Sequence, residues 1–367
     1  MIFRMKPLIL CLMLACAASV FAQFSDRDVE KDALCEKWNS VPLPADASGI
    51  PEPKSFPRCD SYKLYSGIGG KVDFVAARKC AWSERLATEA GLRQTSGDPI
   101  PWAIGGSIIL TELYANGEGV QKNIPLALRL ACEANGDEGK ELEDLLKRME
   151  QPNATKFSYC DHAYDTFTMN FCAAYTSEIE DDKRAQAISR LSSNWTQAQK
   201  STFADAQKAF EEYVTTVGRR ETYLGGTIRN IRVDGVEQEL KQAFFDELLK
   251  FEHGDLPHGS SPDYQHADSD LNTVYRKVLD AAKSPEYPSD DGEIQPGGIH
   301  DTERSWLHYR DAWIAFAQLR YPSTSQNAWS QWLTATRTKR LKLVLCEFNS
   351  KDSLCTPEIL KSLDGEP

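Results

Sequence analysis

The sequence is poor in histidine and lacks the short motifs that mark common catalytic and metal sites. It has six histidines in 367 residues and no His-Glu-x-x-His pattern for a catalytic zinc. It also has no Gly-x-Ser-x-Gly turn to expose a nucleophilic serine and no paired Cys-x-x-Cys spacing. His253, His258 and His266 share one polar loop and leave a metal site open as an alternative, although loop histidines are more often solvated. The sequence therefore predicts no catalytic residue, no cofactor and no metal ion.

Basic residues are outnumbered, and no long apolar run occurs beyond the N-terminus. Lys and Arg number 42 against 54 Asp and Glu, for a formal net charge of −12. A surface of this sign disfavours nucleic acid as a partner, because phosphates need a basic face. It would steer basic partners toward the chain, or it serves solubility alone. Since no later segment has the length of a membrane-spanning helix, we predict no transmembrane span.

The first residues predict export. Arg4 and Lys6 precede an apolar run over residues 7–21, and the small residues of "SVFA" offer a peptidase site. We expect a signal peptide over residues 1–22, cleaved after Ala22, and a periplasmic or secreted chain. Cleavage removes two of the 42 basic residues and none of the 54 acids, which leaves a net charge of −14. The alternative is a lipid anchor on Cys16, within "MLAC".

Cysteine is plentiful, with ten residues, of which all but Cys11 and Cys16 follow the predicted cleavage site. An even number in an exported protein indicates disulfides, although many pairings are open. Spacing favours a bond between Cys160 and Cys172 at the start of one helical segment. It also favours a bond between Cys346 and Cys355, which closes the last helix onto its tail. The other cysteines are Cys35, Cys59, Cys80 and Cys132.

Composition divides the mature chain at polar loops. Residues 23–58 are rich in proline and predict an extended leader, and further joins fall at residues 150–158 and 252–270. Between these joins apolar residues follow helical spacing, which predicts an all-α fold. The expected parts are a helical-hairpin repeat array over residues 59–150, two disulfide-tied helical units over residues 159–251 and 267–346, and a tail over residues 347–367.

Two segments 50 residues apart repeat one pattern, a Gly-x-Gly turn before a helix with alanine at every fourth position. The matched positions are Gly67 with Gly117, Gly69 with Gly119, and Asp73 with Asn123. Glycine permits the backbone of a tight turn, and Asp or Asn can cap the helix that follows. A phosphate-binding loop would need a preceding strand, a third glycine or a Gly-Lys-Ser/Thr ending, and neither copy has these. The pattern favours the turn of a helical hairpin.

This repeat resembles the Sel-like family, which is related to tetratricopeptide repeats. The residues that carry the resemblance are Leu113, Tyr114, Gly117, Gly119, Val120 and Ala127. The resemblance implies a scaffold for protein binding and a disulfide between the helices of a hairpin, which pairs Cys59 with Cys80. Cys132 has no cysteine opposite it in its own hairpin, which leaves Cys35 as its partner.

Three ordered blocks of the C-terminal region resemble the domain named after the lysozyme inhibitor LprI. The blocks are "ADSDLNTVY", "WLHYRDA" and "LTATRTKRL", within residues 267–346. The family usually has a cysteine just after the Arg-Asp-Ala motif, where this chain has Trp313 and Ile314, and another near Trp329. We expect that aromatic packing replaces this second disulfide. Residues 159–251 look like a diverged copy of this domain. In it, Phe210 and Tyr213 correspond in spacing to Trp306 and Tyr309.

The aromatic blocks are the candidate binding site. Their aromatic and basic residues follow helical spacing, which is more often that of a core, but Trp, Tyr and Arg also dominate interface hot spots. The candidate binding residues are Trp306, Tyr309, Arg310, Trp313, Trp329 and Trp332.

Two functions follow from these features. The first is an exported, non-enzymatic protein that binds another protein, with a basic lysozyme-like hydrolase as the candidate partner that the LprI resemblance implies. The alternative is an envelope enzyme that cleaves cell-wall glycan or peptide through dispersed carboxylates, whose spacing across a cleft the sequence cannot reveal.

Overall fold

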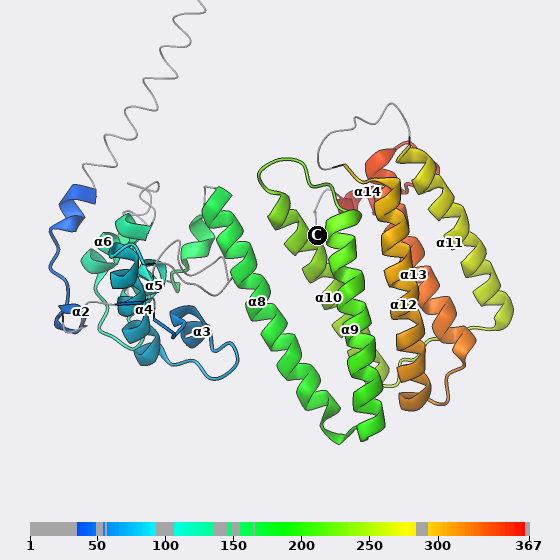
Figure 1. Cartoon of the computed structure of the whole chain (residues 1–367), viewed down its shortest axis with the longest axis horizontal. Helices are drawn as coiled ribbons and strands as arrows, with labels where there is room; N and C mark the ends of the chain where they lie inside the picture. The colour runs from blue at the N-terminus through cyan, green and yellow to red at the C-terminus, as the bar shows by residue number, and fades with distance from the viewer. Residues whose placement is uncertain are drawn as a thin grey trace, which may run out of the picture. The chain divides into compact units, whose positions relative to one another are not determined.

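The structure is a computed structural model that describes residues 35–48, 54–55, 57–92, 106–134, 146–148, 151, 155–163, 166–283 and 293–363. Within these residues the chain is helical and has no strand, which confirms the predicted all-α fold. The predicted signal peptide, residues 1–22, lies outside them. None of the helices in the described ranges is long and apolar enough to cross a membrane. The chain forms two compact units, residues 1–171 and 172–367 (Figure 1).

The helices of the N-terminal unit form two hairpins. The first pairs α3 (Ser61–Ser66) with α4 (Phe74–Glu89), and the second pairs α5 (Ser107–Asn116) with α6 (Ile124–Ala134). α4 also packs against α5, so the hairpins form one continuous stack. A short 3-10 helix, η2 (Tyr159–His162), contacts α5.

The Gly-x-Gly segments turn the two hairpins in the same way. Gly67 and Gly117 end α3 and α5 in the left-handed region, with φ of 78° and 73°. The side chain of Asp73 accepts a hydrogen bond from the backbone N–H of Ala76 at 2.9 Å, which caps α4. The Asn123 side chain accepts one from Leu126 N–H at 3.1 Å in the second copy. The repeated segment is therefore the turn of a helical hairpin, as expected.

The leader is less extended than the sequence predicts. Residues 35–39 are helical, and α2 (Ala45–Ser48) adds another turn. Covalent and polar bonds to α6 hold this part of the leader, because Cys35 is bonded to Cys132 and Arg129 donates a hydrogen bond to the Val41 carbonyl. Proline content alone does not reveal such ties.

The disulfides pair as the sequence analysis expects. Cys59 is bonded to Cys80 across the first hairpin, with Cα atoms 5.9 Å apart. Cys346 is bonded to Cys355, with Cα atoms 5.6 Å apart. Cys160 and Cys172 are both disulfide-bonded as well.

The C-terminal unit is built from long helices. They are most of α8 (Thr166–Leu191), α9 (Gln197–Arg220), α10 (Arg229–Glu252), α11 (Ser261–Ala281), α12 (Pro296–Arg320), α13 (Gln326–Phe348) and the short α14 (Pro357–Leu363), with the 3-10 helix η3 (Ser192–Asn194) after α8. α9 lies along α12, α11 lies along α13, and α10 packs on α9 (Figure 1). Side-chain caps start these helices where the sequence turns polar, with capping boxes at Thr196 and Ser260 and an N-cap at Ser325.

Aromatic rings fill the centre of this unit. Trp313 is 1 % exposed, and its ring lies 5.3 Å from Phe244, 5.4 Å from Phe316 and 6.2 Å from Trp329 between centroids. All three contacts are edge-on, one of the geometries that aromatic pairs prefer. Trp313 stands where the LprI pattern usually has a cysteine, and dense ring packing occupies this position.

A buried ion cluster joins three helices of the C-terminal unit. The Arg337 guanidinium on α13 donates two hydrogen bonds to the Glu221 carboxylate, at 2.8 and 2.6 Å, and a third to Glu303 on α12 at 3.0 Å. Glu221 caps the end of α9, and neither it nor Arg337 has an exposed side chain. Burial would lower the pKa of Arg337, but the Glu221 carboxylate outweighs burial and raises it. The cluster fixes α13 against α9 and α12.

We expect the substitution Arg337→Met to lower the free energy of unfolding by about 3–5 kcal/mol, because it leaves buried carboxylates without their counter-charge. Urea unfolding of the full chain measures this loss. Lys183→Met is the matched control, since the Lys183–Glu180 pair on α8 is exposed, and it should cost less than about 1 kcal/mol. Equal losses for the two variants would contradict the role given to the cluster.

Candidate binding groove

Most of the predicted binding residues belong to the core. Trp306, Tyr309, Trp313 and Trp329 are 2 %, 6 %, 1 % and 0 % exposed. Their burial shows that the stripe mainly packs in the core, which is what its helical spacing more often indicates, and that it does not form a continuous binding surface by itself.

Arg310 and Trp332 are the partly exposed members of the predicted set. Arg310 donates a hydrogen bond to the neighbouring Asp311 at 2.9 Å, and its guanidinium carbon lies 5.4 Å from the centre of the Trp306 ring. Through these contacts Arg310 covers part of the core. Trp332 lines a groove.

This groove opens where α10 and α13 separate. The helices meet at Phe251, whose ring centroid lies 5.0 Å from those of Trp329 and Trp332. Farther along, Leu240 and Ala243 of α10 face Thr336 and Leu343 of α13 across a cavity of about 180 Å³. We call this cavity the α10–α13 groove.

Aromatic residues from α9, α10 and α12 form the floor of the α10–α13 groove. Phe210 lies 4.3 Å from Phe244 in a stacked pair, and the Tyr213 and Tyr309 rings stack at 5.9 Å. Burial raises the pKa of the Tyr309 hydroxyl, so this group stays neutral at any physiological pH. Of the predicted binding residues, Trp306, Tyr309 and Trp332 line the groove.

The rim of the groove carries opposite charges on its two sides. Glu239 and Glu247 lie on the α10 side, and Lys339 and Arg340 lie on the α13 side. Glu239 and Lys339 are exposed. Arg337, which also lines the groove, has its guanidinium bonded to Glu221 and Glu303. The groove can take an apolar side chain at its floor and pair with charged groups at its edge.

The α10 wall of the groove is what the sequence analysis missed. Helical spacing along "ELKQAFFDELLKF" does indicate one apolar face, with Leu240, Phe244, Leu248 and Phe251. Leu248 and Phe251 are buried at one end, whereas Leu240 is only partly covered. The apolar face itself was the available signal in the sequence. Periodicity does not show that a neighbouring helix leaves one end of this face partly uncovered.

Carboxyls with strongly raised pKa are enclosed in the N-terminal unit. Burial raises the pKa of Glu84 and that of Glu112 to about 7. Glu84 accepts a hydrogen bond from Ser61 N–H at 3.0 Å, and Glu112 accepts one from Tyr159 N–H at 2.8 Å. The two side chains are 2 % and 4 % exposed, so neither faces a cleft that a glycan could enter.

The loop histidines do not assemble into a metal-binding cluster in the part of the chain that the structure describes. His266 lies 3.6 Å from the carboxylate of Asp270 on the same helix. Three potential ligand groups do come together at Cys59, Cys80 and Glu84. The two sulfurs are bonded to each other, whereas metals bind the free thiolate.

Comparison with known proteins finds one family model that matches part of this unit. Residues 260–342 match the family model described as lysozyme inhibitor LprI, which confirms the resemblance of the C-terminal region. This segment contains α11, α12 and most of α13, and hence half of the groove lining. No curated protein and no solved structure gives a match to the chain.

Core and surface positions of α12 should respond differently to truncation. We expect Trp306→Ala to lower the free energy of unfolding by about 3–5 kcal/mol, since the ring is buried. The adjacent Leu307 is 37 % exposed, and Leu307→Ala should cost less than about 1 kcal/mol. Urea denaturation monitored by the helical circular dichroism signal, which does not rely on tryptophan, measures both losses. A loss at Trp306 no larger than that at Leu307 would refute its assignment to the core.

Proposed function

We propose that the C-terminal unit binds a protein through the α10–α13 groove and that this partner is a lysozyme-like hydrolase, which the chain inhibits. The observation that carries the proposal is the match of residues 260–342 to the LprI inhibitor family, because the same segment supplies one wall and part of the floor of the groove. The other wall comes from α10, outside the matched segment.

The dimensions and lining of the groove favour a protein side chain over a small-molecule ligand. Its volume of about 180 Å³ is below that of typical ligand pockets, which hold roughly 300–1,000 Å³. Aromatic floors with a polar rim are typical of the centre of protein interfaces, where one or two anchor side chains enter a pocket. We expect the anchor to be an apolar side chain on a loop of the partner.

Charge supports a basic partner. The chain carries a formal net charge of −12, and opposite net charge raises association rates through long-range steering. Glu239 and Glu247 place acidic groups beside the apolar floor. A basic residue next to the anchor side chain would therefore meet α10, and an acidic one would meet Lys339 and Arg340.

Export and duplication complete the proposal. Disulfides persist in oxidising compartments, which supports a periplasmic or secreted location. Release by a signal peptidase is part of the proposal and rests on the N-terminal sequence. The helix order α8, α9, α10 repeats in α11, α12, α13, and the packing of α9 on α12 joins corresponding helices. This order supports a diverged second copy over residues 159–251. The two glycine-turned hairpins support Sel-like repeats over residues 59–150, which would present a second protein-binding surface.

The test is whether a variant with a blocked groove still inhibits lysis by lysozyme. Thr336 is exposed on the groove wall, and Thr336→Arg places a long charged side chain in the opening. Ala335, also exposed, lies on the other side of α13, so Ala335→Arg is the matched control. We expect the purified mature protein to slow at least one lysozyme type, the control to keep this activity, and Thr336→Arg to weaken binding by at least about tenfold, since it removes a central contact.

Lytic rates and the dissociation constant of the complex, both measured with a panel of lysozyme types, decide the outcome. Unchanged rates with every type and no detectable complex would reject the inhibitor function. Inhibition that survives Thr336→Arg would keep that function but reject the groove as its site.

A further inference from the structure

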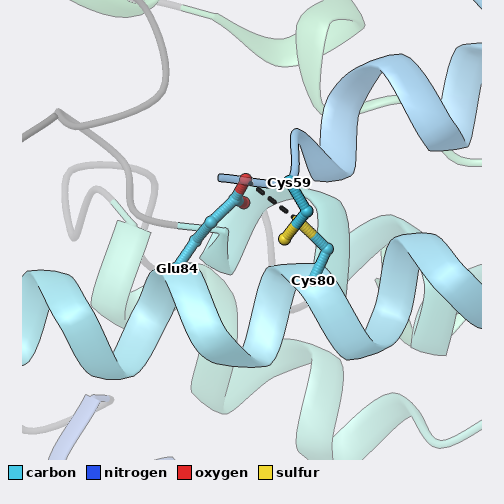
Figure 2. Close-up of side chains that lie close together, drawn as sticks. All are labelled: Cys59, Cys80 and Glu84. Carbon is cyan, nitrogen blue, oxygen red and sulfur yellow. Dashed lines mark hydrogen bonds between the residues drawn. A yellow bond between two sulfur atoms is a disulfide. The ribbon is translucent and has the colours of Figure 1, made fainter. Parts of the chain in front are cut away.

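The Cys59–Cys80 disulfide has a carboxyl group beside it. Glu84 lies one helical turn after Cys80 on α4, and one of its oxygens is 3.4 Å from the Cys80 sulfur (Figure 2). Cys59 is exposed, whereas Cys80 and Glu84 are 4 % and 2 % exposed. A reductant can thus reach one sulfur from solvent, and the other sulfur faces an enclosed acid.

The position of Glu84 is fixed by bonds to the start of α3. Its carboxylate accepts hydrogen bonds from the backbone N–H and the hydroxyl of Ser61. Burial raises the pKa of Glu84 to about 7, against the lowering effect of these Ser61 bonds. Among the described residues, the charged group that acts on Glu84 is Asp60, whose carboxylate raises the pKa further. Near neutral pH the carboxyl therefore carries a proton part of the time.

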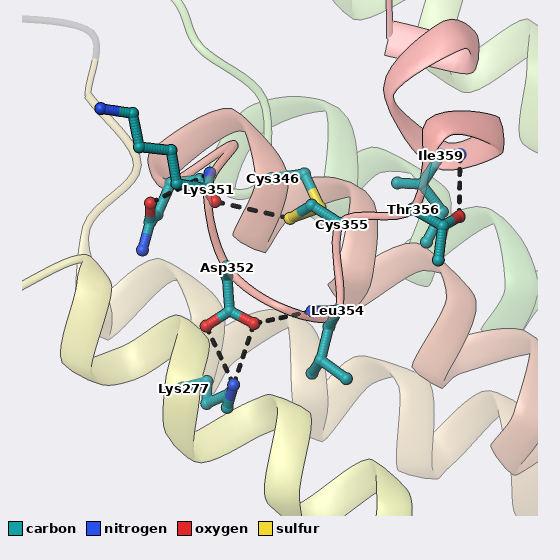
Figure 3. Close-up of a disulfide and its surroundings, with 9 residues drawn as sticks. Lys277, Cys346, Lys351, Asp352, Leu354, Cys355, Thr356 and Ile359 are labelled. Atoms are coloured by element: carbon teal, nitrogen blue, oxygen red, sulfur yellow. Dashed lines mark hydrogen bonds and ion pairs between the residues drawn. A yellow bond between two sulfur atoms is a disulfide. The ribbon is translucent and has the colours of Figure 1, made fainter.

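The Cys346–Cys355 disulfide has a different setting. Cys346 is 2 % exposed and Cys355 is more accessible, so this bond also pairs a covered sulfur with a reachable one. The Cys355 sulfur lies 3.4 Å from the Asn349 carbonyl, which has no proton to give. Asp352 in the same loop accepts the Leu354 N–H and pairs with Lys277 at 2.9 Å, which lowers its pKa (Figure 3). The Cys346–Cys355 disulfide can therefore serve as an internal reference for the rate of disulfide reduction.

We propose that Cys59–Cys80 is a redox-active disulfide that exchanges with an external dithiol, and that Glu84 is the general acid that protonates the departing Cys80 sulfur. The geometry assigns the roles, because attack on the exposed Cys59 sulfur along the sulfur–sulfur bond expels Cys80 toward Glu84. A good leaving group speeds exchange, and a proton delivered to the departing thiolate has that effect.

The exchange balances in protons and electrons. A thiolate of the dithiol attacks the Cys59 sulfur, a mixed disulfide forms, and the bonding pair leaves on Cys80, which takes the proton of Glu84. The second thiol of the reductant loses its proton to water and attacks its own partner sulfur, which releases Cys59 as a thiolate. Water then protonates Cys59 and Glu84. The dithiol is oxidised to a disulfide by two electrons, and Cys59 and Cys80 gain them as thiols.

Timed reduction with dithiothreitol tests the assignment. Samples of the full chain are quenched with acid and alkylated, and mass spectrometry gives the rate for Cys59–Cys80 relative to that for Cys346–Cys355. We expect Glu84→Gln to slow this relative rate by about 10- to 100-fold, at or below the lower end of what a positioned acid contributes, because Glu84 is protonated only part of the time near neutral pH. Glu89→Gln, at an exposed carboxyl on the same helix, should leave it unchanged. A slowing of less than about tenfold for Glu84→Gln would overturn the proposal.

A second measurement needs no variant. The ionisation of the reductant changes both reduction rates by the same factor. The ratio of the Cys59–Cys80 rate to the Cys346–Cys355 rate therefore follows the protonation of Glu84. As pH rises from about 6 to 8, a carboxyl with a pKa near 7 goes from mostly protonated to mostly ionised, and the ratio should fall by about tenfold. Asp352 has a lowered pKa and stays ionised over this range. A ratio that stays constant across these pH values would contradict the role of Glu84, whatever the variant shows about folding.

Discussion

The buried pairing of Arg337 with Glu221 and Glu303 is the interaction on which the C-terminal unit depends. A guanidinium can satisfy two carboxylates at once because its donors lie in a rigid planar fork. Each partner comes from a different element, so the cluster sets the position of α13 on α9 and α12. With α13 held there and α10 packed on α9, the two helices are in ring contact at Phe251, and the α10–α13 groove is lined by both of them farther along.

Aromatic packing gives the groove a rigid floor. Phe210, Phe244 and Tyr309 are core residues whose rings contact one another, and the same residues line the cavity. A preorganised apolar floor spares a partner the entropy cost of ordering it, which is how small interfaces reach useful affinity. In the proposed binding mode, the buried tryptophans support the floor, and the partly exposed Trp332 forms part of a wall.

Local features of the fold and the disulfide pairs were predictable, whereas the long-range contacts between other side chains were not. The glycine turns after α3 and α5, the caps at Asp73 and Asn123, and the LprI-like blocks follow from short spacings whose chemistry is local. The pairing of Arg337 with Glu221 spans 116 positions, and no periodicity links such residues. Helical spacing also identified the apolar face of α10 but not the divergence that leaves Leu240 partly uncovered. Likewise, the spacing from Cys80 to Glu84 is visible in the sequence, whereas the burial that raises the pKa of Glu84 is a property of the folded hairpin.

Hydrogen–deuterium exchange of the full chain, alone and saturated with a lysozyme that it binds, tests the central claim most directly. Amide protection reports which helices a partner covers. The account predicts new protection over residues 239–247 of α10 and 332–343 of α13, with little change in α11. A stable complex whose added protection lies elsewhere, with both groove walls exchanging as in the free protein, would contradict it.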